Sequence, residues 1–246
     1  MLIDFHSHIS PGLDDGAQTL EDSLELARQS VDEGVTHIVA TPHGSSHGLA
    51  GLLDKRDTAL ATFRDALSKE NIPLTVLPGL EYYADGNSAT SALNDPACRC
   101  GVPEAPGRPI LVELPMSLDL SFAGDLLFNA QLHQVPLVLA HPERYNRFKD
   151  KLEFLESLMD KGLYLQFNSD DFYTSLFRHS LCNAMLRLIR HNPQQVVIGS
   201  DCHRPNWRPA GLSCSQDKIT SALGAEVWKL VSQETPASLL GLNIGK

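Results

Sequence analysis

The sequence predicts an α/β fold in which parallel strands alternate with helices and close into a barrel. Seven short apolar segments have the length and composition of strands, and a helical pattern separates most of them. These segments are almost continuously apolar, as strands buried on both faces are. The 246 residues, 42% of them hydrophobic, are enough for a single domain over residues 1–246 with a full core.

The first half of the chain supplies three of these strands and two helices. Leu2–Phe5 is the first strand. Thr19 then begins a helix as a predicted N-cap, with Asp22 three residues further on, and Gly34 ends it. The next elements are a strand over residues 36–40, a polar amphipathic helix near 54–69 and a strand over 73–77.

The second half begins with a segment rich in Pro, Gly, Ala and Cys. Residues 91–109 are therefore expected to form a long loop with one short helical turn. The sequence then predicts strands over 110–113, 136–140, 163–167 and 195–199, and helices near 121–133, 149–160, 175–190 and from about 217 onward.

Composition argues against several classes of protein. No segment approaches the roughly 20 apolar residues of a membrane span, and the N-terminus lacks the pattern of a signal peptide. The net charge of −10, without a run of Lys or Arg, argues against a nucleic-acid partner. Five cysteines, an odd number, indicate reduced thiols in the cytoplasm. Cys98 and Cys100 are too close in sequence for an ordinary structural zinc pair.

Histidines and carboxylates follow one predicted strand after another. In a barrel of parallel strands the C-terminal ends share one rim, so these residues are expected to meet there. In each of the patterns His6-x-His8 and Asp201-x-His203, the two side chains point to the same face. Imidazole together with carboxylate suits zinc, manganese or iron. The residues are His6, His8, Asp14, Asp15, His43, Glu81, Glu113, His141, Asp201 and His203.

Taken singly, each of these residues also has a structural interpretation. A histidine at a strand end is more often a surface or core residue, and either adjacent aspartate is a plausible cap. The same placement recurs at six strand ends, however, which favours a metal cluster. His47 is a weaker candidate for a supporting role. The remaining histidines, His37, His133, His179 and His191, are interpreted as structural.

Arg144 and Arg208 follow His141 and His203 on loops of the same predicted rim. A guanidinium group binds two phosphate oxygens at once. Alone, each arginine would be interpreted as a surface ion-pair partner. Beside a metal cluster, a phosphate-binding role is as well supported.

These motifs resemble those of the polymerase and histidinol phosphatase (PHP) family. The resemblance is carried by His6-Ser7-His8, Thr41-Pro42-His43, Ala140-His141-Pro142-Glu143-Arg144 and Ser200-Asp201-Cys202-His203. The chain is more similar still to the family's bacterial protein-tyrosine phosphatases linked to capsule and exopolysaccharide synthesis, through Asp14-Asp15-Gly16, Gly79-Leu80-Glu81-Tyr82-Tyr83 and Val112-Glu113-Leu114-Pro115. The motifs occur in order over nearly the whole chain.

The resemblance implies a distorted, seven-stranded TIM-like barrel that holds three divalent ions, most often manganese, with iron, magnesium or zinc as alternatives. It assigns His6, His8, Glu81 and Asp201 to the first ion, Glu81, Glu113 and His141 to the second, and Asp15, His43 and His203 to the third. Arg144 and Arg208 would bind the phosphoryl group. The choice of Asp15 over Asp14 rests on the motif alone.

The expected reaction is phosphomonoester hydrolysis by a metal-bound hydroxide on a phosphotyrosine protein. The resemblance suggests the tyrosine-rich tail of a polysaccharide-synthesis kinase as the partner. A small-molecule phosphatase, a phosphodiesterase and a non-catalytic metal-binding module are the alternatives. Two segments depart from the family pattern. After His43 this branch often carries a basic or amide residue, but here Gly44-Ser45-Ser46 follows. The Cys98–Pro109 segment is unusually long. Both are expected near the rim.

Overall fold

The computed structural model describes residues 1–84, 89–116, 119–173 and 179–243, and these form a barrel-like arrangement of parallel strands. Every pairing between the named strands is parallel. The strands are β1 (Ile3–Ser7), β2 (His37–Ala40), β3 (His43–Gly44), β4 (Thr75–Pro78), β5 (Glu81–Tyr83), β6 (Ile110–Glu113), β7 (Leu137–Ala140), β8 (Tyr164–Asn168) and β9 (Val196–Gly199).

The strands fall into two sheets, with the orders β1-β2-β4 and β3-β5-β6-β7-β8-β9. β3 begins three residues after β2 ends, and β5 begins three residues after β4 ends, so each pair occupies one position around the barrel. The prediction of seven strand positions is therefore confirmed, but the short strands β3 and β5 were not predicted. Gly79 permits the second interruption, because a Cβ there would lie 2.7 Å from Cγ1 of Val39.

The barrel does not close as a continuous ladder, in agreement with the expected distortion. β1 meets the segment after β9 through an isolated bridge between Ser7 and Cys202. Two further backbone hydrogen bonds support this seam, from the amide of Asp201 to the carbonyl of His6 at 2.8 Å and from His8 to Cys202 at 2.9 Å. The seam therefore brings the ends of the first and last strands into direct contact.

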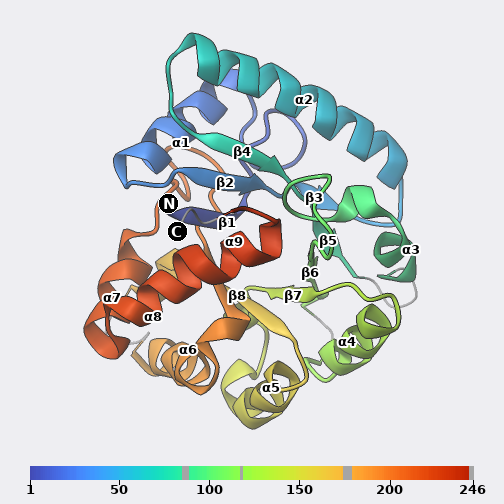
Figure 1. The fold of residues 1–246 in the computed structure, drawn as a ribbon, viewed down its shortest axis with the longest axis vertical. Helices are drawn as coiled ribbons and strands as arrows, with labels where there is room; N and C mark the ends of the chain where they lie inside the picture. Colours follow the sequence, from blue (N-terminus) through green and yellow to red (C-terminus); the bar gives the residue numbers. More distant parts are fainter. Residues whose placement is uncertain (85–88, 117–118, 174–178, 244–246) are drawn as a thin grey trace.

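Helices surround the strands, and α9 lies across the centre of the view in Figure 1. Strand residues such as Phe5, Leu111 and Val197 form an inner core with Ala237 and Leu240 of α9. A larger core lies between the strands and the outer helices. The helices are α1 (Leu20–Asp32), α2 (Leu49–Lys69), α3 (Ala89–Asn94), α4 (Phe122–Leu132), α5 (Leu152–Met159), α6 (His179–His191), α7 (Ser213–Leu223), α8 (Ala225–Lys229) and α9 (Thr235–Leu240), the last two joined by a π turn over Leu230–Glu234.

The predicted N-cap of α1 is confirmed as a capping box between Thr19 and Asp22. Helix α2 begins at Leu49, five residues earlier than predicted, and the C-terminal helical region begins at Ser213. Part of the predicted 175–190 helix lies outside the described residues. None of the helices in the described ranges is long and apolar enough to cross a membrane.

The Cys98–Pro109 segment was expected near the rim, and this prediction was wrong. The segment leads into the N-terminal end of β6, whereas the rim is formed by the C-terminal ends. The amide of Val102 donates to the carbonyl of Leu240 in α9 at 2.9 Å. The segment thus packs with α9 at the other end of the barrel.

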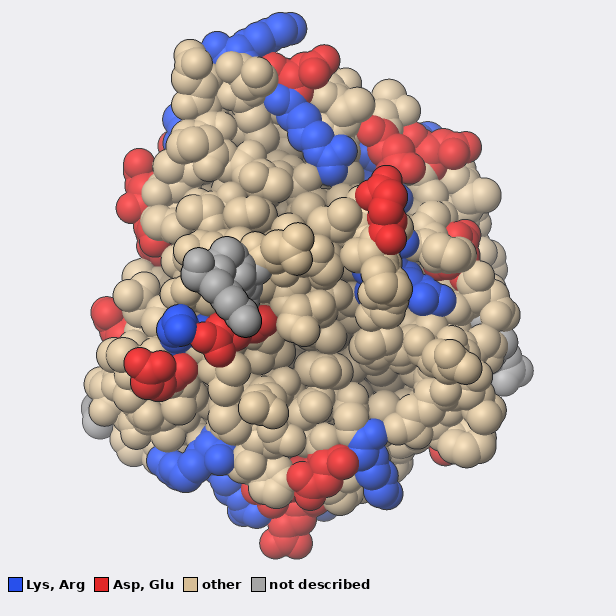
Figure 2. Space-filling model, in the orientation of Figure 1, with Lys and Arg blue, Asp and Glu red and all other residues tan. Residues whose placement is uncertain are grey.

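On the face shown in Figure 2, Lys and Arg lie close to Asp and Glu, mostly near the edges.

Candidate metal centre

All nine predicted metal-binding residues gather at the C-terminal ends of the strands. Each offers a nitrogen or oxygen within 4.8 Å of its group partners. The described residues form four overlapping groups of this kind. They are His8, Asp15, His43 and His203; His6, Glu81 and His141; His6, His8 and Asp201; and His43, Glu81 and Glu113.

His6 in β1 and His8 just after it turn their imidazoles toward Glu81 and Asp201. Their Nε2 atoms lie 3.2 Å apart, and each lies 3.2 Å from Oε2 of Glu81. The distances to Oδ1 of Asp201 are 3.6 and 3.3 Å. All four side chains are buried. Buried imidazole nitrogens and carboxylate oxygens at this spacing are a donor set for a divalent cation.

A second group lies closer to solvent. Oδ1 of Asp15 is 3.6 Å from Nε2 of both His43 and His203. His43 also reaches inward, with Nδ1 2.9 Å from Oε2 of Glu81. The Glu81 carboxylate therefore lies between the inner and outer groups, which is the position a bridging ligand would take.

Glu81 also connects to the third part of the cluster, at β6 and β7. Its Oε1 lies 2.7 Å from Nε2 of His141, which is 3.9 Å from Oε1 of Glu113. Burial and the neighbouring charge of Glu81 raise the pKa of Glu113. A cation between the two carboxylates would relieve this repulsion.

Hydrogen bonds behind the imidazoles fix which ring nitrogen faces the cluster. Nδ1 of His6 donates to Oε1 of Gln166 at 2.8 Å, and Nδ1 of His8 donates to Oδ2 of Asp14 at 2.7 Å. Nδ1 of His203 donates to the carbonyl of Asp201 at 2.9 Å. In a neutral imidazole this leaves Nε2 unprotonated, as metal binding requires. The donor set and its tautomers therefore fit divalent cations.

Gln166 and Asn168 are site residues that the sequence analysis missed. Nε2 of Gln166 donates to Oδ1 of Asn168 at 2.9 Å, and Nδ2 of Asn168 donates to Oδ2 of Asp201 at 2.9 Å. Together they join His6 to Asp201 through hydrogen bonds. A signal was present, because two amides alternate at the end of the otherwise apolar strand β8 and must point to one side.

Asp4, two residues before His6 in β1, is another residue that the sequence analysis missed. It is fully buried, and its Oδ1 accepts hydrogen bonds from the amides of Ser200 at 2.8 Å and His6 at 3.2 Å. Burial raises the pKa of Asp4 to about 6 despite these bonds. Asp4 thus joins β1 to the segment after β9 directly beneath the cluster.

The buried charges of the cluster stabilise one another. Burial opposes the charged form of His8, but hydrogen bonds to Asp14, Asp201 and Glu81 outweigh it and raise the pKa of His8 well above its ordinary value. Burial also opposes ionisation of Asp201, yet the charges of His6 and His8 hold its pKa well below the usual range. Without cations, protons on the histidines would compensate the carboxylates.

Arg144 and Arg208 both reach the Asp201 carboxylate at the edge of the cluster. Nη1 of Arg144 lies 2.6 Å from Oδ2 of Asp201, and Nη2 of Arg208 donates to the same oxygen. Their side chains are 33% and 25% exposed. The two guanidinium groups are therefore anchored on one carboxylate and still open to solvent, as a phosphate-binding pair would be.

Three site residues have positive φ angles although none is glycine. These are His141 at 29°, Asp201 at 52° and Arg208 at 57°. Such conformations are uncommon for side-chain-bearing residues and concentrate at functional sites. His141 directly follows β7 and Asp201 is the second residue after β9, and both side chains point into the cluster.

The histidines interpreted as structural are in none of the four donor groups, and His37 contacts Oγ1 of Thr36. His133, His179 and His191 contact the Asn129 carbonyl, Asn183 and Asp160, away from the cluster. His47 is in none of the four donor groups but lines a cavity beside them.

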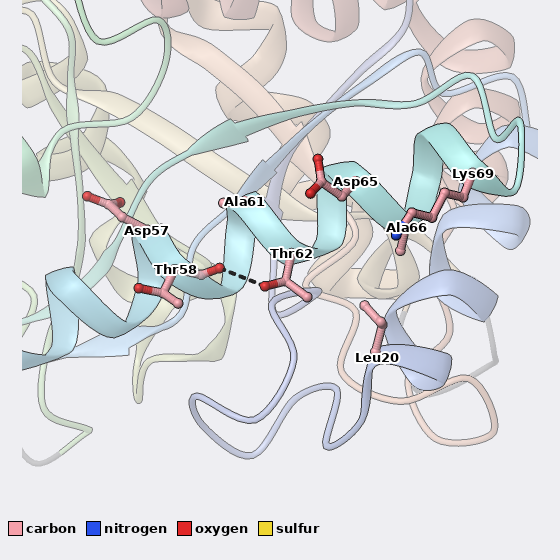
Figure 3. Close-up of a pocket in the computed structure, with 8 residues that line it drawn as sticks. All are labelled: Leu20, Asp57, Thr58, Ala61, Thr62, Asp65, Ala66 and Lys69. Carbon is pink, nitrogen blue, oxygen red and sulfur yellow. Dashed lines mark hydrogen bonds between the residues drawn. The ribbon is translucent and has the colours of Figure 1, made fainter.

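A different hollow, of about 590 Å³, runs along α2 near Leu20 (Figure 3). Thr62 there donates to the carbonyl of Thr58 at 3.1 Å. No histidine is among the described residues that line it. Despite its volume, this hollow therefore lacks the imidazole donors of the candidate metal centre.

Comparison with known proteins identifies the family. Residues 2–241 match the family model described as capsular polysaccharide synthesis, CpsB/CapC. The chain belongs to the CpsB/CapC family. The family expected from the motifs is thereby confirmed.

Individual members of the CpsB/CapC family are similar over most of their length. The tyrosine-protein phosphatase YwqE of Bacillus subtilis is 34% identical over 211 residues, covering 84% of this chain and 79% of YwqE. The tyrosine-protein phosphatase CpsB of Streptococcus agalactiae is 27% identical over 247 residues, covering 97% and 98%. A structure from work on YwqE and Streptococcus pneumoniae CpsB, described as metal-dependent tyrosine phosphatases, matches with a TM-score of 0.81 and 28% identity, covering 99% and 96%.

Proposed function

We propose that this chain is a metal-dependent protein-tyrosine phosphatase that acts in capsular or exopolysaccharide synthesis. The observation that carries the proposal is the convergence of nine imidazole and carboxylate side chains from six strand positions, next to two arginines anchored on one of them. The relatives in the CpsB/CapC family, named tyrosine-protein phosphatases, support the reaction class.

The donor set would hold three divalent ions, with manganese as the first candidate and iron, magnesium or zinc as alternatives. The inner ion would take His6, His8, Glu81 and Asp201, the second Glu81, Glu113 and His141, and the third Asp15, His43 and His203. Three divalent ions against four carboxylates leave two positive charges, which would match a phosphate dianion. Bound ions would supply Lewis-acid chemistry and lower the pKa of a coordinated water.

The protein's own groups would orient the ester and stabilise charge. Arg144 and Arg208 would bind phosphoryl oxygens, because their guanidinium groups are held in place by Asp201 and remain accessible. Gln166 and Asp14 would keep the imidazoles of His6 and His8 in the orientation and tautomer that leave Nε2 free. A phenolate leaving group, with a pKa of about 10, needs less protonation than an alkoxide would.

The test is hydrolysis of a phosphotyrosine peptide by purified protein, before and after chelation and after readdition of Mn²⁺. We expect activity that chelation removes and Mn²⁺ restores, with metal content near three ions per chain. Histidinol phosphate and a phosphodiester, assayed in parallel, represent the alternative enzyme classes. Faster turnover of either one would contradict the proposed substrate class, and no turnover by the metal-loaded protein would favour a non-catalytic module.

The proposed partner is the tyrosine-rich tail of a polysaccharide-synthesis kinase. The proposed location is the cytoplasm, supported by five cysteines that are all unpaired. Dephosphorylation of such a tail by the purified protein, compared with an unrelated phosphotyrosine protein, would test the partner.

A further inference from the structure

A cavity of about 470 Å³ opens beside the metal centre, at β3, β5, β6 and the start of α2. Its lining includes His43 and Glu113, which also belong to the donor groups of the centre. The cavity therefore directly adjoins the metal centre.

The rest of the lining consists of Leu52 and Tyr83, which supply apolar and aromatic surface, together with Gly44, Ser45 and His47. Leu52 of α2 is half-buried, and Tyr83 of β5 is 38% exposed. A Cβ on Gly44 in this lining would be 3.0 Å from Cδ2 of Leu52 and 2.8 Å from Cδ1 of Leu80. Leucine side chains thus occupy the space that a larger residue at position 44 would need.

The cavity and the two arginines lie on different sides of the centre. Arg144 and Arg208 come from the segments after β7 and β9 and meet at Asp201. The cavity lies at β3, β5 and β6, which occupy other positions around the barrel. A phosphate whose oxygens faced the arginines would leave the β3–β6 side free for its organic group.

We propose that this cavity binds the aromatic ring of the substrate's phosphotyrosine, with Leu52 and Tyr83 as specificity-determining residues; this inference rests on the proposed phosphatase function. An apolar cavity of about 150 Å³ is already sufficient to hold benzene, so the volume is ample. The apolar and aromatic surface of Leu52 and Tyr83 favours an aromatic ring over water. The single methylene of a phosphoserine would leave the cavity unfilled.

The experiment compares two non-hydrolysable ligands that share one head group, phenylphosphonate and methylphosphonate. Calorimetry on the full-length, Mn²⁺-loaded protein gives both affinities without turnover. We expect roughly tenfold tighter binding of phenylphosphonate, from burial of the ring. Leu52→Ala and Tyr83→Ala should each reduce this preference about threefold or more and leave methylphosphonate binding unchanged. Tyr83→Phe should retain the preference, because the ring is kept.

Trp207 supplies the matched control, because it is another exposed aromatic residue close to the centre. It is 54% exposed, and its ring lies 5.8 Å from the guanidinium of Arg208. Trp207→Ala should keep the preference for phenylphosphonate. Loss of the preference in Trp207→Ala, or its persistence in both cavity variants, would overturn the proposal.

The two proposals fail in different ways. Hydrolysis of phosphotyrosine peptide together with equal affinities for the two phosphonates would overturn the ring site and leave the phosphatase function intact. A ring preference that depends on Leu52 and Tyr83, without hydrolysis of any phosphotyrosine peptide, would support the aryl-binding cavity and contradict the proposed activity.

Discussion

Oδ2 of Asp14 lies 2.7 Å from Nδ1 of His8, and this contact distinguishes Asp14 from the adjacent Asp15. Asp14 also accepts hydrogen bonds from the amides of His43 and Gly16, so it supports the cluster from behind. Asp15 instead faces the imidazoles of His43 and His203 at 3.6 Å. The geometry thus supports the motif-based choice of Asp15 as the ligand candidate.

Substitution of the two aspartates should therefore have different effects on metal binding. Asp14→Ala should weaken metal affinity about 10- to 100-fold, because His8 loses its orienting partner, while the number of ions at saturation is retained. Asp15→Ala should remove one ion per chain. Metal titration with elemental analysis measures both. Loss of an ion in Asp14→Ala but not in Asp15→Ala would reverse the assignment.

Loss of either arginine should reduce catalysis and spare the metal content. We expect Arg144→Ala and Arg208→Ala to lower kcat/KM for a phosphotyrosine peptide about 100-fold each, since each removes a donor to the developing charge. Arg147 is the control: it lies in the same loop as Arg144, its side chain is 73% exposed, and it pairs with Asp150. Arg147→Ala with a comparable loss would argue against a specific phosphate contact.

Stabilisation by metal should grow as the pH rises. Burial acts to lower the pKa values of His6 and His8, but nearby carboxylates raise both above the ordinary value. In the metal-free protein these histidines therefore contribute stability that is complete below about pH 6.5 and is lost as the pH rises through the raised pKa values. Metal requires the neutral imidazoles.

The difference in Tm between the Mn²⁺-loaded and the metal-free protein should accordingly increase from pH 6 to pH 8. Thermal melts at several pH values, at one fixed concentration of free Mn²⁺, measure this difference. A difference that shrinks over this range would show that protons on His6 and His8 do not compete with the metal.

Thiol alkylation should leave the activity unchanged. Burial raises the pKa of the Cys98 and Cys202 thiols to about 12, and Cys214 alone among the five cysteines is not buried. Iodoacetamide should therefore modify one cysteine in the native protein, as counted by mass spectrometry, without affecting turnover. Inactivation in step with alkylation would point to a cysteine nucleophile instead.

Close packing of β9 against β1 predicts that Gly199→Ala is destabilising. A Cβ on Gly199 would lie 2.6 Å from Cβ of His6 and 2.8 Å from its backbone nitrogen. We expect a loss of about 1–3 kcal/mol in the free energy of unfolding, with weaker metal binding as His6 shifts. Gly51→Ala is the control, because it faces open space in α2 and should stabilise that helix by up to about 1 kcal/mol. Urea unfolding compares the two variants, and equal stabilities would contradict the packing argument.

The sequence determined the fold class, the seven strand positions and the nine donor residues of the candidate centre. It could do so because the composition of a strand, and the position of a residue such as His6 or Glu113 at its end, can be read locally. In a barrel of parallel strands the C-terminal ends share one rim, so residues at these ends lie close together. The interruptions that create β3 and β5 were not predictable, since they depend on contacts such as Gly79 against Val39 across the sheet.

Tertiary structure alone decided how the centre is supported and where its surroundings lie. Gln166 and Asn168 acquire their function only because β8 places them between His6 and Asp201. The Cys98–Pro109 segment packs with α9 at the end of the barrel opposite the metal centre, where the amide of Val102 donates to the carbonyl of Leu240. The sequence shows where an apolar strand ends. It does not show which residues, distant in sequence, will be hydrogen-bond partners, because such pairs follow no periodic pattern.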